Sequence, residues 1–250
     1  MIPVKSKKDL AMLRRAGKIL AGIMQKLKGF MQAGISTAEI DSFSQELFRK
    51  EGVISAFKGY KGFPAYICIS VNEEVVHGIP SPRRLKEADL VSIDLGINYQ
   101  GYFADAAFTL AIGRVDVRKT ELIEVTKKSL LEGIKQMRKN YHLSDISHAI
   151  QTYVERYGFS VVREFVGHGI GLSLHEEPQI PNFGPPHQGP MLKSGMVLAI
   201  EPMVNMGGWE VKISDNGWTA ITKDGLASAH FEHTVAITDN GPEILTLNTN

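Results

Sequence analysis

A chain of 250 residues, 43% of them hydrophobic, can bury a large core, and its length fits one domain or two closely packed halves. Its 28 basic residues nearly balance 27 acidic ones, which excludes a general electrostatic affinity for nucleic acid or membrane surfaces. The single cysteine, Cys68, excludes an internal disulfide and a cysteine-based zinc or redox motif. Because no uncharged apolar run approaches roughly 18 residues and residues 1–10 lack the apolar part of a secretory signal, we expect a cytoplasmic protein.

Two helices are predicted at the start of the chain. Apolar residues recur at helical spacing from Lys7 to Phe30, directly after the N-cap candidate Ser6. Ser36 and Glu39 form a capping box that opens a second helix, which runs to about Lys50 and ends at Gly52.

Strands follow, and then the order of elements recurs. Segments 66–71, 90–97 and 102–112 are rich in β-branched and aromatic residues, and a short turn joins the last two into a hairpin. After Gly113, helices are predicted at 119–139 and 144–157, and a strand at 159–166. The five prolines within 178–190 predict an irregular surface loop.

A short internal match accompanies this recurrence. Shifting the chain by 201 − 94 = 107 positions lays residues 86–94 over 193–201, with a carboxylate, Asp94 or Glu201, at the end of each copy. Chance similarity between two apolar strands is the alternative. The match favours a single α+β domain, residues 1–250, made of pseudo-symmetric halves at about 1–113 and 114–250. We expect them to share a mostly antiparallel sheet with helices on its outer face.

Four acidic residues lie on apolar strand segments without an adjacent lysine or arginine: Asp94, Asp105, Glu201 and Glu232. Any one of them is explained by an ordinary buried hydrogen bond or ion pair. Four together are too costly to bury as charges unless cations neutralise them. Such oxygen ligands, with one or two imidazoles, suit divalent Mn, Fe, Co or Zn, and bridging carboxylates hold pairs of ions about 3.5 to 4 Å apart.

Histidines supply the remaining candidates. His168 stands between two glycines that permit close backbone approach, which makes it the favoured imidazole ligand. His77 and His175 are either structural or, beside a metal pair, donors to a carbonyl or an amide nitrogen. His230 and His233 flank Glu232, and we expect both to point away from it and to be structural.

Competing motifs are missing from the sequence. It has no His-Glu-x-x-His zinc helix, no Gly-x-Ser-x-Gly nucleophile elbow, and no third glycine that would complete a dinucleotide fingerprint after His168. Cys68 lies between two isoleucines, which is typical of a small core residue rather than a nucleophile.

The ordered set of motifs resembles the type I methionine aminopeptidases, a family of the pita-bread metallohydrolases. The segments that carry the resemblance are Phe57-Lys-Gly-Tyr60, Ile69-Ser-Val-Asn-Glu-Glu-Val-Val-His-Gly-Ile-Pro80, Ile93-Asp94, Asp105-Ala106, Gly167-His-Gly-Ile-Gly171, His175-Glu-Glu-Pro178, Ala199-Ile-Glu-Pro202 and His230-Phe-Glu-His233. The resemblance implies a curved pita-bread sheet, two divalent ions per chain, and removal of N-terminal methionine from nascent proteins and peptides whose second residue is small.

The family's residue roles map onto matching positions. By resemblance, Asp94 chelates the first ion, Asp105 and Glu232 bridge both, and His168 and Glu201 complete the second. A metal-bridging hydroxide attacks the scissile carbonyl, with Glu201 as proton shuttle. His175 stabilises the oxyanion and His77 contacts the scissile amide. The methionine pocket maps onto Phe57, Tyr60, Phe63, Cys68, Leu174, His175 and Trp218, with Leu174 where an aromatic residue often occurs and Phe57 where a cysteine can occur.

Two rival functions stay open. A prolidase or proline-specific aminopeptidase shares the five ligands but normally carries an extra N-terminal domain. A catalytically silent binding module usually loses metal ligands. The resemblance also implies an enzyme of the bacterial or organellar type. We expect it to be a monomer. Eight basic residues between Lys5 and Lys28, against one acid, are either a solvated helix face or a weak ribosome contact.

Overall fold

The predicted helices are present in the computed structural model, which describes residues 2–247. They are α1 (Lys7–Phe30), α2 (Thr37–Glu51), α3 (Val117–Lys135) and α4 (Leu143–Arg156), and a short 3₁₀ helix spans Tyr60–Gly62. Local signals explain their ends. The side chain of Ser6 accepts from the amide of Asp9, that of Ser36 accepts from the amide of Glu39, and each acid caps in return. Gly52 ends α2 with φ +67°, a left-handed conformation that favours glycine.

The strands of the described residues form four antiparallel sheets. The first contains β1 (Ile54–Ser55), β2 (Cys68–Val71), β4 (Leu90–Tyr99) and β5 (Tyr102–Ala111), the last two as the predicted hairpin. A five-stranded sheet has the order β15 (Gly241–Ile244), β14 (His233–Thr238), β9 (Val197–Ile200), β7 (Gly167–Gly169) and β8 (Glu176–Ile180). The three-stranded sheets are β13 (Ser228–His230), β10 (Met203–Asn205) and β6 (Ser160–Val161), and β11 (Val211–Ile213), β12 (Ala220–Thr222) and β3 (Glu74–Val76).

The predicted strand at 159–166 is wrong over most of its length, because only β6 forms. Val161 pairs with Val204, and continuing that register places Arg163 opposite Pro202. Proline has no N–H to donate to a ladder, so pairing stops there.

The predicted loop at 178–190 is also partly wrong, because residues 178–180 belong to β8. β8 is the edge strand of its sheet, the position at which a proline is tolerated within a sheet.

The two large sheets meet in the middle of the molecule. The amide of Glu232 donates to the carbonyl of Ala107 over 3.0 Å, and the hydroxyl of Thr234 donates to the carbonyl of Asp105 over 2.7 Å. The β4–β5 hairpin is thereby joined to β14 at the positions where the acidic residues lie.

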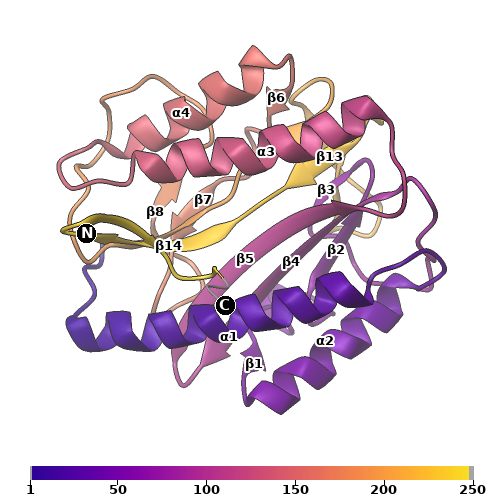
Figure 1. Ribbon diagram of the computed structural model, residues 1–250, viewed down its shortest axis with the longest axis horizontal. Helices are drawn as coiled ribbons and strands as arrows, with labels where there is room; N and C mark the ends of the chain where they lie inside the picture. The colour runs from indigo at the N-terminus through magenta and orange to yellow at the C-terminus, as the bar shows by residue number, and fades with distance from the viewer. Residues whose placement is uncertain (1, 248–250) are drawn as a thin grey trace.

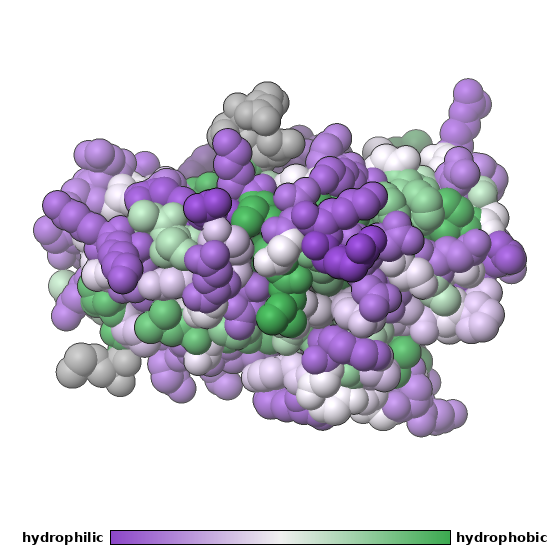
Figure 2. Space-filling model, turned by 90° about the horizontal axis from the view of Figure 1, so that it is seen from below, coloured by the Kyte–Doolittle hydropathy of each residue, from purple (hydrophilic) through white to green (hydrophobic). Residues whose placement is uncertain are grey.

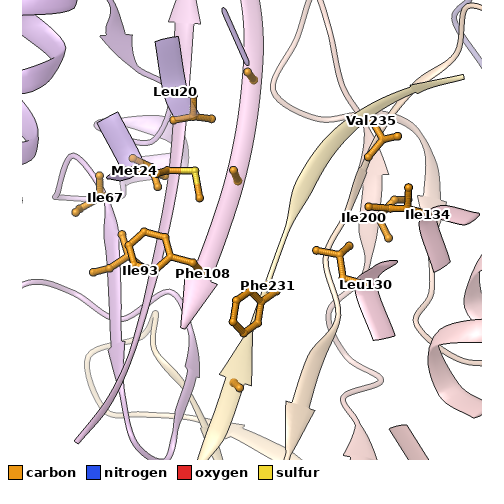
Figure 3. Packing of buried hydrophobic residues seen from close by; sticks show 14 of the residues in the cluster. Leu20, Met24, Ile67, Ile93, Phe108, Leu130, Ile134, Ile200, Phe231 and Val235 are labelled. Carbon is orange, nitrogen blue, oxygen red and sulfur yellow. The ribbon is translucent and has the colours of Figure 1, made fainter. Parts of the chain in front are cut away.

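The helices cover one face of these strands (Figure 1). α1 packs on β5 and α3 packs mainly on β13, while α2 and α4 lie beside them. The hydrophobic core beneath the helices contains residues from both ends of the chain. Figure 3 shows Phe231 between two groups of core residues. The first group is Leu20, Met24, Ile67, Ile93 and Phe108, and the second is Leu130, Ile134, Ile200 and Val235.

In each half of the chain, two helices precede an antiparallel pair of strands. The hypothesis that the two halves are copies of one unit stays a prediction. Among residues 2–247, no helix is both long enough and apolar enough to span a membrane.

Candidate metal centre

Strand register places the first two acids on one face of the hairpin. Asp94 on β4 lies opposite Ala107, and Asp105, two residues before Ala107 on β5, lies opposite Gly96. Since side chains alternate along a strand, Asp94 and Asp105 are diagonal neighbours on the same face. Cys68 on β2 is directly opposite Asp94 from the other side and shares that face.

The same reasoning applies to the second sheet. His168 on β7 pairs with Ala199, two residues before Glu201. His233 pairs with Ile200, so continuing the register places Glu232 opposite Glu201. His168, Glu201 and Glu232 therefore share one face, and the junction of the two sheets brings this face to the two aspartates.

The glycines beside His168 have a steric reason. A Cβ at Gly167 would lie 2.5 Å from the carbonyl oxygen of Ala199, and one at Gly169 would lie 2.2 Å from that of Glu177. Nδ1 of His168 lies 2.9 Å from the carbonyl oxygen of Gly169. This contact favours the tautomer with a proton on Nδ1, so Nε2 carries a lone pair toward the acids, which is the arrangement typical of a metal ligand.

The ligand atoms converge. One atom from each of Asp105, His168 and Glu232 lies within 4.8 Å of those of the other two, and all three residues are buried. Oε1 of Glu201 lies 3.4 Å from Nε2 of His168. Asp94 faces the same cavity.

Burial sets the electrostatics of the four acids. It raises the pKa of Asp105 to about 7 and is the main cause that raises the pKa values of Asp94, Glu201 and Glu232 well above their usual range, with mutual repulsion adding to it. Within residues 2–247, none of these carboxylates pairs with a lysine or arginine, and Oδ1 of Asp94 and Oε1 of Glu232 have no hydrogen-bond partner. Buried, repelling and unpartnered oxygens beside an imidazole nitrogen fit divalent cations.

A cavity of about 180 Å³ joins this cluster to an apolar wall. It is lined by every residue assigned above to the metal site, to the two histidine roles and to the methionine pocket: Phe57, Tyr60, Phe63, Cys68, His77, Asp94, Asp105, His168, Leu174, His175, Glu201, Trp218 and Glu232. Lys61 also lines it and was not anticipated, since a lysine in a glycine-flanked turn gives no sequence signal.

The two further histidines, His77 and His175, both have lowered pKa values. The Nδ1 atom of His175 lies 2.9 Å from the hydroxyl of Tyr60, and burial followed by the charge of Lys61 lowers its pKa. Burial lowers the pKa of His77 to about 4. Its backbone has φ +60°, and its ring meets Phe165 edge-on at 5.3 Å.

The apolar wall is packed by aromatic rings. Phe63 and Trp218 meet edge to face with centroids 5.2 Å apart. Burial, followed by the charge of Asp94, raises the pKa of Cys68 well above its usual range, so this residue stays a thiol, an apolar group rather than a nucleophile.

A buried ion pair holds the loop that carries Leu174 and His175. The ammonium group of Lys5, whose side chain is 3% exposed, contacts Oε2 of Glu176. Oε1 of Glu176 accepts from the amides of Leu172 and Ser173 over 2.7 and 3.2 Å. Lys5 was counted above with the basic helix, and nothing in a run of lysines distinguishes the one that is buried.

The expectation that both histidines beside Glu232 point away is wrong for His230. Its Nε2 atom lies 3.8 Å from Oε2 of Glu201, because β13 ends at His230 and the chain passes to β14 of another sheet before His233. His233 does point away, with Nδ1 2.8 Å from the hydroxyl of Thr246.

Four carboxylates and one imidazole that line the same cavity as an apolar wall are typical of a metal-dependent enzyme that binds an apolar substrate group. The sequence model described as metallopeptidase family M24 matches residues 11–239, and the chain belongs to that family.

Similar proteins cover the chain almost completely. It is 52% identical to methionine aminopeptidase 1 of Bacillus subtilis, over 98% of this chain and 99% of that protein. It is 51% identical to methionine aminopeptidase of Clostridium perfringens, over 99% of each. The crystal structure of methionine aminopeptidase from Thermotoga maritima superimposes with a TM-score of 0.97 at 46% identity, covering 99% of this chain and 100% of that one.

A more distant structure shares only the fold. Prolidase from Pyrococcus furiosus has a TM-score of 0.81 at 24% identity, and the match covers 99% of this chain but 66% of that one. The pita-bread fold is therefore confirmed.

Proposed function

We propose that this enzyme removes N-terminal methionine from nascent proteins and peptides whose second residue is small. The proposal is based on one observation: the four acids and His168 line the same cavity as an apolar wall of aromatic, leucine and thiol side chains. A wall of this kind suits one flexible thioether side chain. The relatives at 50% identity or more carry the same activity in their names.

Five residues of the chain would bind the metal ions. Asp94, Asp105, His168, Glu201 and Glu232 would hold two divalent ions, with Asp105 and Glu232 placed to serve both. When bound, such a pair supplies Lewis acidity at the scissile carbonyl and a hydroxide nucleophile at neutral pH. Which of Mn, Fe, Co and Zn occupies the site depends on the availability of each metal in the cell as well as on its affinity for the site.

The remaining polar groups act on the substrate. His175 donates to the developing oxyanion, and its hydrogen bond with Tyr60 orients the ring. His77 contacts the scissile amide nitrogen. Glu201, which lines the cavity beside the other acids, moves the proton to the leaving amine.

The substrate assignment is tested with four peptides under one metal condition: Met-Ala-Ser, Met-Phe-Ser, Leu-Ala-Ser and Ala-Pro-Ser. We expect kcat/KM to be highest for Met-Ala-Ser, because a bulky second residue displaces the carbonyl and about 1 Å of misplacement can cost 10²-fold. Preference for Ala-Pro-Ser would instead establish the proline-specific activity, and no cleavage with metal bound would favour a binding module.

The enzyme is a cytoplasmic monomer that meets nascent chains, with a weak contact between α1 and the ribosome. This contact depends on Lys7, Lys8 and Lys18, which are exposed. The side of the molecule on which α1 lies in Figure 1 is rich in hydrophilic residues (Figure 2). Lys5 is buried, and Arg14 and Lys26 are each paired with a glutamate at 2.7 Å. Replacing Lys7, Lys8 and Lys18 together by glutamate should abolish cosedimentation with ribosomes, and unchanged cosedimentation would exclude the contact.

A further inference from the structure

His230 is a buried imidazole without a partner. Its residue is 1% exposed, and among residues 2–247 neither ring nitrogen has a hydrogen-bond partner. Buried polar groups in native proteins are normally satisfied, so an imidazole with two unsatisfied nitrogens needs an explanation.

The backbone of His230 is fixed from two sides. Its amide donates to the hydroxyl of Thr109 over 2.8 Å, and its carbonyl lies 2.9 Å from the same hydroxyl. Its Cα is also paired with that of Met203 in the β10–β13 ladder. The ring is therefore held where it is by the fold and not by contacts of its own nitrogens.

The ring faces Glu201. The Nε2 atom of His230 lies 3.8 Å from Oε2 of Glu201, while Oε1 of the same carboxylate lies 3.4 Å from Nε2 of His168. Each oxygen of Glu201 is thus directed to a different imidazole. His168 lines the cavity and His230 does not, so Oε1 is on the cavity side and Oε2 on the interior side.

We propose that His230 is a positioning residue for Glu201: an N–H at Nε2 donates to Oε2 and keeps Oε1 turned toward the metal. The proposal rests on the assignment of Glu201 as a metal ligand. The 3.8 Å separation is longer than a hydrogen bond, and such contacts often tighten only when a site is filled. The backbone carbonyl of Glu201 is already held by the side-chain amide of Asn182 at 3.1 Å, so the carboxylate is the part left to orient.

Two substitutions separate the hydrogen bond from the volume of the side chain. His230→Leu replaces the imidazole donor by an apolar side chain of similar size. His230→Gln keeps a side-chain N–H that can donate. His233→Gln is the matched control, since the imidazole of His233 is only three positions from His230 in the sequence but faces Thr246. The measurement is the dissociation constant for Mn²⁺, by titration calorimetry on chelator-treated protein without any peptide.

The expected result follows from what outer hydrogen bonds contribute at metal sites. His230→Leu should weaken Mn²⁺ binding about 10- to 100-fold, and His230→Gln should restore most of the affinity. The KM for Met-Ala-Ser should change little, and His233→Gln should bind Mn²⁺ like the unmodified protein.

Several results would overturn the proposal. Equal affinity in the leucine variant would show that Glu201 needs no such donor. A glutamine variant as weak as the leucine variant would show that the imidazole itself is required, for example as a ligand. Unchanged affinity with altered discrimination between Met-Ala-Ser and Met-Phe-Ser would make His230 a substrate contact.

A second measurement requires no stable leucine variant. In the Zn²⁺-loaded enzyme, the Nε2 proton of His230 should give a slowly exchanging downfield NMR resonance that disappears in His230→Gln. Its absence in the unmodified protein would also overturn the proposal. Because calorimetry and NMR use no substrate, failure to cleave Met-Ala-Ser would affect the proposed function alone.

Discussion

Removing the ammonium group of Lys5 tests how the N-terminal segment supports the active-site loop. Lys5→Met keeps the length of the side chain but leaves the carboxylate of Glu176, 11% exposed, without its cation. Removing one partner of a buried pair typically costs 3–5 kcal/mol, and we expect about 3 kcal/mol because the amides of Leu172 and Ser173 still donate to Glu176. For a chain of this size, about 3 kcal/mol lowers Tm by roughly 6–12 °C.

The assay is thermal unfolding followed by circular dichroism, with and without divalent metal, beside kcat/KM on Met-Ala-Ser. Lys26→Met is the matched control because the Lys26–Glu51 pair has a 2.7 Å contact but is solvent-exposed, so its loss should cost less than about 1 kcal/mol. We also expect Lys5→Met to lower kcat/KM roughly ten- to a hundredfold, because the loop carries Leu174 and His175. A Tm like that of Lys26→Met would refute the reasoning, and Lys5→Met with Glu176→Gln should recover part of the loss.

Three further predictions concern the centre itself. Asp105→Asn should reduce metal content and lower kcat by more than the 10–100-fold that loss of an outer partner costs, because its carboxylate serves both ions; near-normal turnover with full metal content would contradict this. His175→Ala should lower kcat on the order of 10² to 10³ at unchanged metal content, and an emptied site would instead make His175 a ligand. Since burial raises the pKa of Asp105 to about 7, the metal-free carboxyl holds a proton at pH 6 that a cation must displace. Metal binding should therefore weaken as pH falls and release more protons at pH 6 than at pH 9, measured by calorimetry in buffers of different ionisation enthalpy; no proton release at pH 6 would disagree.

Local signals in the sequence predict the helices well. Ser6 and Ser36 cap helices that begin within a residue of their expected positions, because a capping box is satisfied within one turn of chain. The strand predicted at 159–166 failed because its length depends on Pro202, about 40 positions away, which cannot extend the ladder. Strand length is set by the partner, and a single segment contains no information about its partner.

The candidate site likewise contains residues that the sequence identifies and residues that only the fold identifies. The four acids were identifiable because buried charge on apolar strands is unfavourable without cations. The orientation of His230 could not be predicted by strand alternation, because β13 ends at His230 and β14 begins only at His233. The ion pair of Lys5 with Glu176 spans 171 positions, and only the fold brings its partners together.

We expect peptide cleavage to depend on divalent ions held by Asp94, Asp105, His168, Glu201 and Glu232. The most direct test is to strip the protein with a chelator, verify its metal content by elemental analysis, and titrate Mn²⁺ while measuring kcat on Met-Ala-Ser. We expect negligible turnover in the stripped protein and recovery that is complete by about two equivalents per chain. Full turnover in protein shown to contain no metal would contradict it.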